Sequence, residues 1–164
     1  MSSRRSRSRS RSRSPERPNF TPSGILARYE NENSGIAIKY TEPLDASLPR
    51  YHWRLFVYEG NNEKDPIDLH IKSSYIIGRD ENIADILIPH MSVSKEHAAI
   101  QFRKRKSHIL PYIIDLESKN GTYLNDKKLE AARFYEIQSQ DILTFGTCEM
   151  EYVAVKGDKL RYRE

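Results

Sequence analysis

The chain has 164 residues, a formal net charge of +4 and 37% hydrophobic residues, a low share that indicates that part of it does not fold. Its single cysteine, Cys148, excludes an internal disulfide framework and fits a reducing intracellular compartment, with the thiol buried and inert. No apolar run approaches the ~20 residues of a membrane span and no signal peptide is visible, so no membrane contact is expected.

Residues 4–14 are an arginine-serine repeat, and residues 1–16 are predicted to be a disordered tail. Residues 1–18 hold seven arginines and one glutamate, whereas the rest of the chain holds 20 basic and 22 acidic residues. The basic character therefore belongs to the tail and not to the remaining chain. The tail is either a solvated basic localisation signal or a phosphorylatable tract that resembles the RS domains of splicing factors, where each phosphate adds about −1.5 to −2 charge.

Residues 17–49 carry scattered apolar side chains without a strand or helix period. These are too few for a core and too many for an inert linker. We therefore predict an extended linear segment that folds on a partner, and the alternative is a strap packed on the chain's own domain. The predicted docking residues are Phe20, Ile25, Leu26, Ile36, Ile38 and Tyr40.

Residues 50–156 are predicted to form one all-β sandwich of about ten or eleven strands, because short β-branched and aromatic runs alternate with turn formers. The expected strands are Trp53–Tyr58, Ile67–Lys72, Tyr75–Gly78, Asp85–Ile88, Ala98–Arg103, Tyr112–Leu116, Thr122–Leu124, Lys127–Leu129, Arg133–Ile137, Asp141–Phe145 and Cys148–Val155. The second and third are expected to pair as a hairpin. The fifth and sixth form another, with Lys104–Leu110 as its loop and Pro111 opening the return strand. Residues 157–164 are expected to be a frayed polar end.

The most informative side chains lie in the loops between these strands. Arg79, Ser94 and Asn120 follow or precede apolar runs, and in a sandwich their loops can meet at one end. A guanidinium, a hydroxyl and an amide there suit a phosphorylated side chain on a peptide. The alternative for Arg79 is a surface ion pair with Asp80 or Asp85.

The ordered set Gly-Arg, Ser-x-x-His and Asn-Gly-Thr-x-x-Asn, ending at Asn125, resembles the forkhead-associated (FHA) domain, a phosphothreonine-peptide reader. The resemblance covers roughly Arg50 to Val155. It implies phosphate contact by Arg79, Ser94 and the more variable Lys95. Asn120 would hold the peptide backbone, and Lys119 stands where a serine or threonine often precedes this asparagine. Gly78, His97, Gly121 and Thr122 are then the structural support of the site.

The segments PNFTPSGILA and IKYTEPLDA, directly before PRYHWRL, are similar to the pre-mRNA leakage protein and Smad nuclear-interacting protein family. This resemblance implies a nuclear, monomeric subunit of the pre-mRNA retention and splicing (RES) complex, and hence of the spliceosome. It also implies that the N-terminal segment docks on a subunit with an RNA-recognition-motif (RRM) fold.

No enzyme, cofactor or metal site is expected. The chain has no Walker loop, HExxH, GxSxG or kinase signature. No ligand stands at metal spacing from His97, and the other histidines, His52, His70, His90 and His108, are scattered. The alternative function is direct RNA binding by the RS tail and the basic run Arg103–Lys106, although this run lacks interleaved aromatic residues.

Overall fold

The computed structural model describes residues 38–161, so the predictions for the RS tail and for most of the docking segment lie outside the described residues. The chain divides into two compact units, Met1–Leu44 and Asp45–Glu164. Residues 38–43 contain no strand or helix, and all strands belong to the second unit. None of the described residues forms a helix long and apolar enough to span a membrane.

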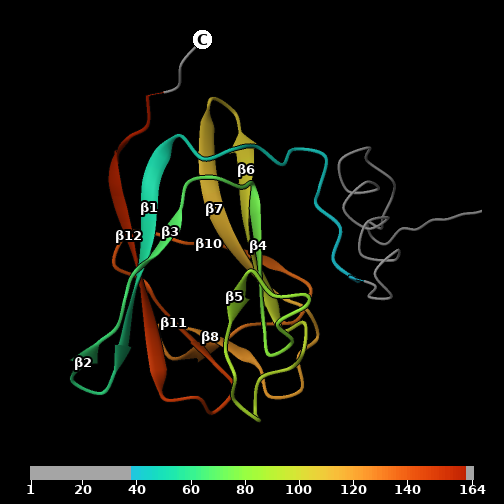
Figure 1. The fold of residues 1–164 in the computed structure, drawn as a ribbon. Helices are drawn as coiled ribbons and strands as arrows, with labels where there is room; N and C mark the ends of the chain where they lie inside the picture. The colour runs from blue at the N-terminus through green and yellow to red at the C-terminus, as the bar shows by residue number, and fades with distance from the viewer. Residues whose placement is uncertain (1–37, 162–164) are drawn as a thin grey trace, which may run out of the picture. The chain divides into compact units, whose positions relative to one another are not determined.

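The second unit is built from β-strands alone, as predicted (Figure 1). Its twelve strands are β1 (Tyr51–Glu59), β2 (Asn62–Glu63), β3 (Ile67–Leu69), β4 (Ser74–Gly78), β5 (Ile86–Leu87), β6 (Ala98–Arg105), β7 (His108–Asp115), β8 (Thr122–Leu124), β9 (Lys127–Lys128), β10 (Phe134–Glu136), β11 (Ile142–Phe145) and β12 (Met150–Lys159). The strand beyond the predicted number is β2, which lies in a stretch whose polar residues indicated only a turn.

The strands form two sheets. One has the order β10-β7-β6-β4-β5, and the other has the order β2-β1-β12-β11-β8-β9 with β3 added beside β1. All neighbours are antiparallel except β4 and β5, which run parallel. The buried apolar side chains pack into one cluster to which both sheets contribute, for example Leu55 and Val57 from β1 and Ile100 and Phe102 from β6. The predicted all-β sandwich is therefore confirmed.

The predicted hairpin between Ile67–Lys72 and Tyr75–Gly78 is wrong. β3 pairs with β1, with Arg54 opposite Asp68, whereas β4 pairs with β6 and β5 in the other sheet. The chain therefore crosses from one sheet to the other between these two strands. Local β propensity identified both strands, but it carries no information about which sheet each one joins.

The hairpin of β6 and β7 was predicted correctly as a pair, but its loop is much shorter than expected. Arg105 pairs with His108, so only Lys106 and Ser107 form the turn. Pro111 lies inside β7, opposite Phe102, and does not open the strand. The polar and basic residues that follow Arg103 are therefore part of β6 and β7 and not of a loop. The two strands extend beyond the part of the sheet that carries apolar side chains.

The short stretch Asp45–Ser47 packs on the half of β6 that leads into the β6–β7 turn. The Ser47 N–H donates to the Phe102 carbonyl at 3.1 Å, and the Lys104 N–H donates to the Asp45 carbonyl at 2.8 Å. The Asp45 carboxylate accepts two hydrogen bonds from the Arg103 guanidinium, at 2.9 and 3.0 Å. The last residues of the predicted docking segment 17–49 thus form a strap on the domain, which was the alternative for that segment.

The final strand, β12, continues to Lys159, into the segment where a frayed end was predicted. Its register with β1 shifts near His52, because Tyr51 pairs with Lys159 while Trp53 pairs with Lys156. One extra residue of β12 therefore forms a β-bulge opposite His52. A Cβ at Gly157 would lie 2.5 Å from the His52 carbonyl oxygen, so this close approach of the two backbones requires glycine.

Candidate functional site

Four loops meet at the end of the sandwich that lies opposite the β6–β7 turn (Figure 1). They are residues 79–85 after β4, 88–97 after β5, 116–121 after β7 and 146–149 between β11 and β12. Hydrogen bonds join them directly. The Arg79 N–H donates to the Ser94 carbonyl at 3.0 Å, the Asn120 amide donates to the Ser92 carbonyl at 2.8 Å, and the Thr147 N–H donates to the Ser92 hydroxyl at 2.8 Å.

Gly78, at the end of β4, allows the first two loops to touch. A Cβ built on this residue would lie 2.0 Å from the Lys95 carbonyl oxygen and 2.8 Å from its carbonyl carbon. Both atoms belong to the backbone and cannot rotate away, so any side chain at this position would push the Ser94–Lys95 loop out of place. The glycine before Arg79 thus serves loop packing.

Arg79 is exposed, but one end of its guanidinium is fixed. Its Nε donates to the Val93 carbonyl at 2.9 Å. It forms no ion pair with Asp80 or with any other described carboxylate, and Asp85 instead bonds the Lys72 ammonium and the Ile76 N–H. The two terminal nitrogens of Arg79 therefore remain as a fork of donors held in a defined orientation.

Ser94, Lys95 and Lys119 belong to loops that are hydrogen-bonded to Arg79 or to each other. The Ser94 hydroxyl oxygen accepts from the Lys119 N–H at 3.1 Å, which leaves the hydroxyl hydrogen to donate to a ligand. Lys95 and Lys119 are both exposed. Together with Arg79 they give these loops three cationic side chains and one small hydroxyl donor, a set of groups that favours an anion.

Asn120 offers the site an amide on an exposed turn. One hydrogen of its NH₂ group is used in the bond to Ser92, so its carbonyl oxygen and second hydrogen remain for a ligand backbone. Gly121 follows with φ of +91°, a conformation that L side chains rarely adopt. This turn sets the direction of the Asn120 side chain before β8 begins at Thr122.

His97 connects the two loops that carry Ser94 and Asn120. Its ring is fully buried; Nδ1 accepts from the Ser94 N–H at 3.0 Å, and Nε2 donates to the Gly121 carbonyl at 2.9 Å. These partners assign the neutral tautomer with hydrogen on Nε2. Both ring nitrogens are therefore occupied inside the domain, and His97 presents no free atom to a metal or substrate.

The protonation state of His97 should make the stability of the domain depend on pH. Burial lowers the pKa of His97 below its ordinary value of 6.5, opposed in part by the bond to Gly121 and the charge of Asp115. Below pH 6.5 the unfolded chain takes up a proton that the folded ring resists, so we expect the free energy of unfolding to fall as the pH drops from there toward the folded-state pKa. Urea titrations between about pH 7.5 and about pH 5 measure this.

His97→Gln, which keeps one donor and one acceptor, is the control variant for this pH dependence. Its urea midpoint should change less than that of the original chain over the same pH range. An identical pH dependence in the two proteins would show that His97 is not responsible.

Asp115, at the end of β7, holds the Asn120 turn and was not identified from the sequence. Its buried carboxylate accepts from the Ser118 N–H at 3.0 Å, the Ser118 hydroxyl at 2.6 Å and the Thr122 hydroxyl at 2.7 Å. Ser118 in turn accepts from the Gly121 N–H at 2.9 Å. The available signal was the spacing of an aspartate followed three and seven residues later by hydroxyl side chains.

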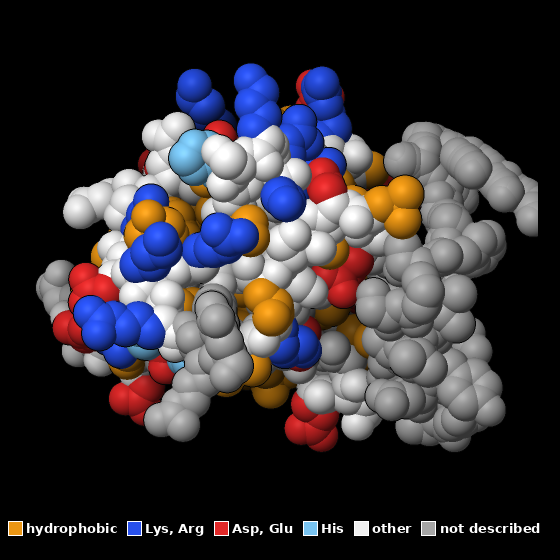
Figure 2. Space-filling model, turned by 90° about the horizontal axis from the view of Figure 1, so that it is seen from above, with side chains coloured by type: hydrophobic (Ala, Val, Ile, Leu, Met, Phe, Trp, Pro, Cys, Tyr) orange, Lys and Arg blue, Asp and Glu red, His pale blue; other side chains and the backbone are white. Residues whose placement is uncertain are grey.

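The basic run Arg103–Lys106 lies away from these loops, at the β6–β7 turn. Arg103 is committed to Asp45 and stacks over the Phe134 ring at 4.4 Å. The other three residues of the run are exposed. Figure 2 looks down on the end that carries this turn, and Lys and Arg side chains are spread over it.

The predicted docking residues are only partly described. Ile38 and Tyr40 are half-buried and belong to the first unit. Phe20, Ile25, Leu26 and Ile36 lie outside the described residues.

Comparison with known proteins identifies relatives of the chain. The FHA domain family matches residues 75–146. Smad nuclear-interacting protein 1 of Mus musculus is 41% identical over 147 residues, which cover 84% of this chain and 38% of that protein. Pre-mRNA leakage protein 1 of Saccharomyces cerevisiae is 35% identical over 163 residues, which cover 80% of each. The solved structure of the yeast Pml1 splicing factor, described with its integration into the RES complex, superimposes with a TM-score of 0.69 at 30% identity, covering 74% of this chain and 99% of that chain.

Several relatives are much longer proteins. The chain spans 12% to 47% of the length of four curated relatives that are 39–41% identical to it. One of them, in Dictyostelium discoideum, is named as a probable serine/threonine-protein kinase, of which the chain spans 12%. Pre-mRNA leakage protein 1, in contrast, is matched over most of its length. The chain therefore belongs to the FHA-domain family of pre-mRNA leakage protein 1 and Smad nuclear-interacting protein 1.

Proposed function

We propose that the chain is a phosphothreonine-peptide-binding subunit of a nuclear RES complex, and that it docks on an RRM-fold subunit through its N-terminal segment. The peptide-binding part rests on one observation, the Arg79 guanidinium fork beside the Ser94 hydroxyl and the Asn120 amide. The splicing part is supported by the yeast relative, which is described as a splicing factor integrated into the RES complex.

The residues of the site suit two parts of a phosphothreonine peptide, the phosphate and the backbone. The fork of Arg79 matches two phosphate oxygens, Ser94 donates to a third, and Lys95 and Lys119 add charge without fixed geometry. The Asn120 amide pairs with the peptide backbone, which orients the chain across the loops. These contacts only bind and orient the peptide, so the proposal assigns the chain no catalytic step; it acts as an interaction module.

Calorimetry with a library of phosphothreonine peptides tests the peptide-binding part on the full chain. Two charge-assisted hydrogen bonds contribute about 3–6 kcal/mol, so removing the phosphate from a bound peptide should weaken binding about 100-fold or more. A matched set with threonine or phosphoserine at the same position is the control. If no phosphopeptide binds, or if the unmodified peptides bind equally well, the site does not have this function.

The docking part predicts that two sites work independently. A peptide of residues 17–43 should capture the RRM-fold subunit without the rest of the chain, and Phe20→Ala with Leu26→Ala should abolish capture, because a few apolar anchors carry the affinity of a segment that folds on binding. Pull-down with the purified subunit measures this. Asn19→Ala with Ser23→Ala is the polar control, and Arg79→Ala in the full chain should leave capture unchanged. A partner that requires Arg79 would contradict two independent sites.

Direct RNA binding is a second candidate, favoured by the exposed basic side chains at the β6–β7 turn (Figure 2). Their contacts would be to phosphates, and Arg103 is already paired with Asp45. Affinity of this kind, to which the RS tail would also contribute, falls steeply with salt and with deletion of residues 1–18, whereas phosphopeptide binding would survive that deletion.

A further inference from the structure

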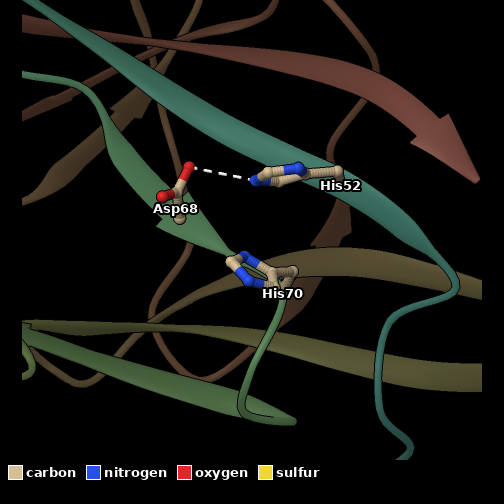
Figure 3. A group of neighbouring side chains, drawn as sticks. All are labelled: His52, Asp68 and His70. Atoms are coloured by element: carbon tan, nitrogen blue, oxygen red, sulfur yellow. Dashed lines mark hydrogen bonds and ion pairs between the residues drawn. The ribbon is translucent and has the colours of Figure 1, made fainter. Parts of the chain in front are cut away.

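A cluster of two imidazoles and one carboxylate lies on the outer face of the β1–β3 pair. In β1, Trp53, Leu55 and Val57 point into the core, so His52 and Arg54 lie on the opposite face. Arg54 pairs with Asp68 and Trp53 with Leu69 in the antiparallel register, and the next position along this register brings His70 opposite His52. The two imidazole rings lie 4.4 Å apart, centroid to centroid, with Asp68 beside them (Figure 3).

The donor atoms of the cluster converge. His52 Nε2 lies 3.0 Å from Asp68 Oδ1, and one ligand atom from each of His52, Asp68 and His70 lies within 4.8 Å of the other two. Among the described residues this is the only group of three or more such side chains so arranged. These residues are separated by up to eighteen positions in the sequence, which is why the histidines looked scattered there.

One atom of the cluster lacks a partner. His70 Nδ1 is buried and forms no hydrogen bond with any described residue. A buried ring nitrogen without a partner costs free energy, and native structures rarely leave one so. This second observation is independent of the spacing of the side chains, and it indicates that an atom outside the described residues completes the environment of His70.

We propose that His52, Asp68 and His70 bind a first-row transition cation, Zn²⁺ being the representative case. Imidazole nitrogens select such cations over Mg²⁺ and Ca²⁺, which prefer oxygen ligands. Zn–N and Zn–O bonds of about 2.0–2.2 Å in a tetrahedron place the ligand atoms roughly 3.3 Å apart, so small side-chain rotations would close the present cluster around the ion. With three protein ligands, the fourth position stays open to water or to a group from a partner.

Arg54 positions the carboxylate. Its Nε donates at 2.9 Å to Asp68 Oδ1, the same oxygen that lies 3.0 Å from His52 Nε2, so the carboxylate is held beside the histidines (Figure 3). Hydrogen bonds of this kind from outside the ligand set orient metal-binding carboxylates. On the other side of β1, the bulge in β12 brings Gly157 against the His52 backbone, so the strand that carries His52 is held between two neighbours. The backbone that carries His52 is therefore held in position by its strand pairing before any cation binds.

The cation would link the two strands. β3 has three residues and pairs with β1 alone, outside the main strand order of its sheet. Ligands from both strands would attach this short edge strand to the sandwich. Binding would therefore slow amide hydrogen exchange in β3.

The test is calorimetric titration of the full chain, purified without a histidine tag and treated with chelator, with ZnCl₂. We expect a single cation per chain, reversal by EDTA, and affinity at least tenfold weaker for His52→Ala and for Asp68→Asn. His108 is an exposed histidine at the first residue of β7, outside the cluster. The control variant His108→Ala should therefore bind ZnCl₂ as the original chain does. Absence of binding, or equal binding by all variants, would overturn the proposal.

A second measurement needs no variant. In the ¹⁵N spectrum of the histidine rings, addition of Zn²⁺ should shift the signals of His52 and His70 and leave those of His90, His97 and His108 unchanged. Bound Co²⁺ should give the visible absorption of a tetrahedral site, and Zn²⁺ should remove it. Shifts confined to the other three histidines would place the cation elsewhere and contradict the assignment.

Discussion

Arg79→Ala is expected to remove phosphothreonine-peptide binding while the sandwich stays folded. The guanidinium supplies a fork of charge-assisted bonds, each contributing about 1.5–3 kcal/mol, so the affinity should fall about 100-fold or more. The folded state loses only the bond from Nε to the Val93 carbonyl, about 0.5–1.5 kcal/mol. Calorimetry with the best-binding phosphopeptide and thermal unfolding measure the two effects.

Two further variants make the Arg79 prediction specific. Arg79→Lys keeps the charge but not the fork, so it should recover only part of the affinity. Arg105→Ala removes an exposed arginine at the β6–β7 turn and should not change phosphopeptide binding. If Arg79→Ala and Arg105→Ala weaken binding equally, the effect is one of general positive charge and the specific contact is refuted.

Asp115→Ala is expected to lower both stability and peptide affinity. Its carboxylate accepts three hydrogen bonds, and Thr122 is fully buried, so the variant leaves donors without partners and should cost about 2–4 kcal/mol. The same loss releases Ser118 and the turn that carries Asn120, so the peptide contact becomes less well ordered. Urea denaturation and calorimetry with a phosphopeptide measure the two losses.

Asp115→Asn is the matched control, since its side chain has the same size and keeps one acceptor oxygen. It should lose less stability than the alanine variant, with peptide affinity between that of Asp115→Ala and the original chain. An alanine variant as stable as the original would mean that water replaces the carboxylate at no cost. The inferred support of the Asn120 turn would then be wrong.

Much of the fold was predictable because its strands carry local signals. From Trp53 to Tyr58 buried residues alternate with exposed or half-buried ones, and the Asn125-Asp126 turn has positive φ at both residues, a conformation these residue types tolerate. Where neighbouring residues alone indicate a strand or a turn, the predicted strands agree with the observed ones to within a few residues. The loops of the site could be located because each follows or precedes such a strand.

The pairing of β3 and β4 was not predictable in this way. Both segments have β propensity and two serines separate Lys72 from Tyr75, which is the pattern of a hairpin. The choice of sheet depends on partners far along the chain, Arg54 for Asp68 and Ala98 for Ile77. The same distance effect hid the approach of His52 to His70.

The pairing of β1 with β12 has a consequence for the newly made chain. These are the first and last strands of the unit, and their register runs from Tyr51–Lys159 to Glu59–Met150. The strands from β4 to β7 can pair as soon as they leave the ribosome, and β1 can pair with β2 and β3, whereas the edge of β1 that faces β12 stays unpaired until the final strand is made. An unpaired strand edge promotes aggregation. Synthesis that stalls before Met150 therefore leaves a product that chaperones must shield.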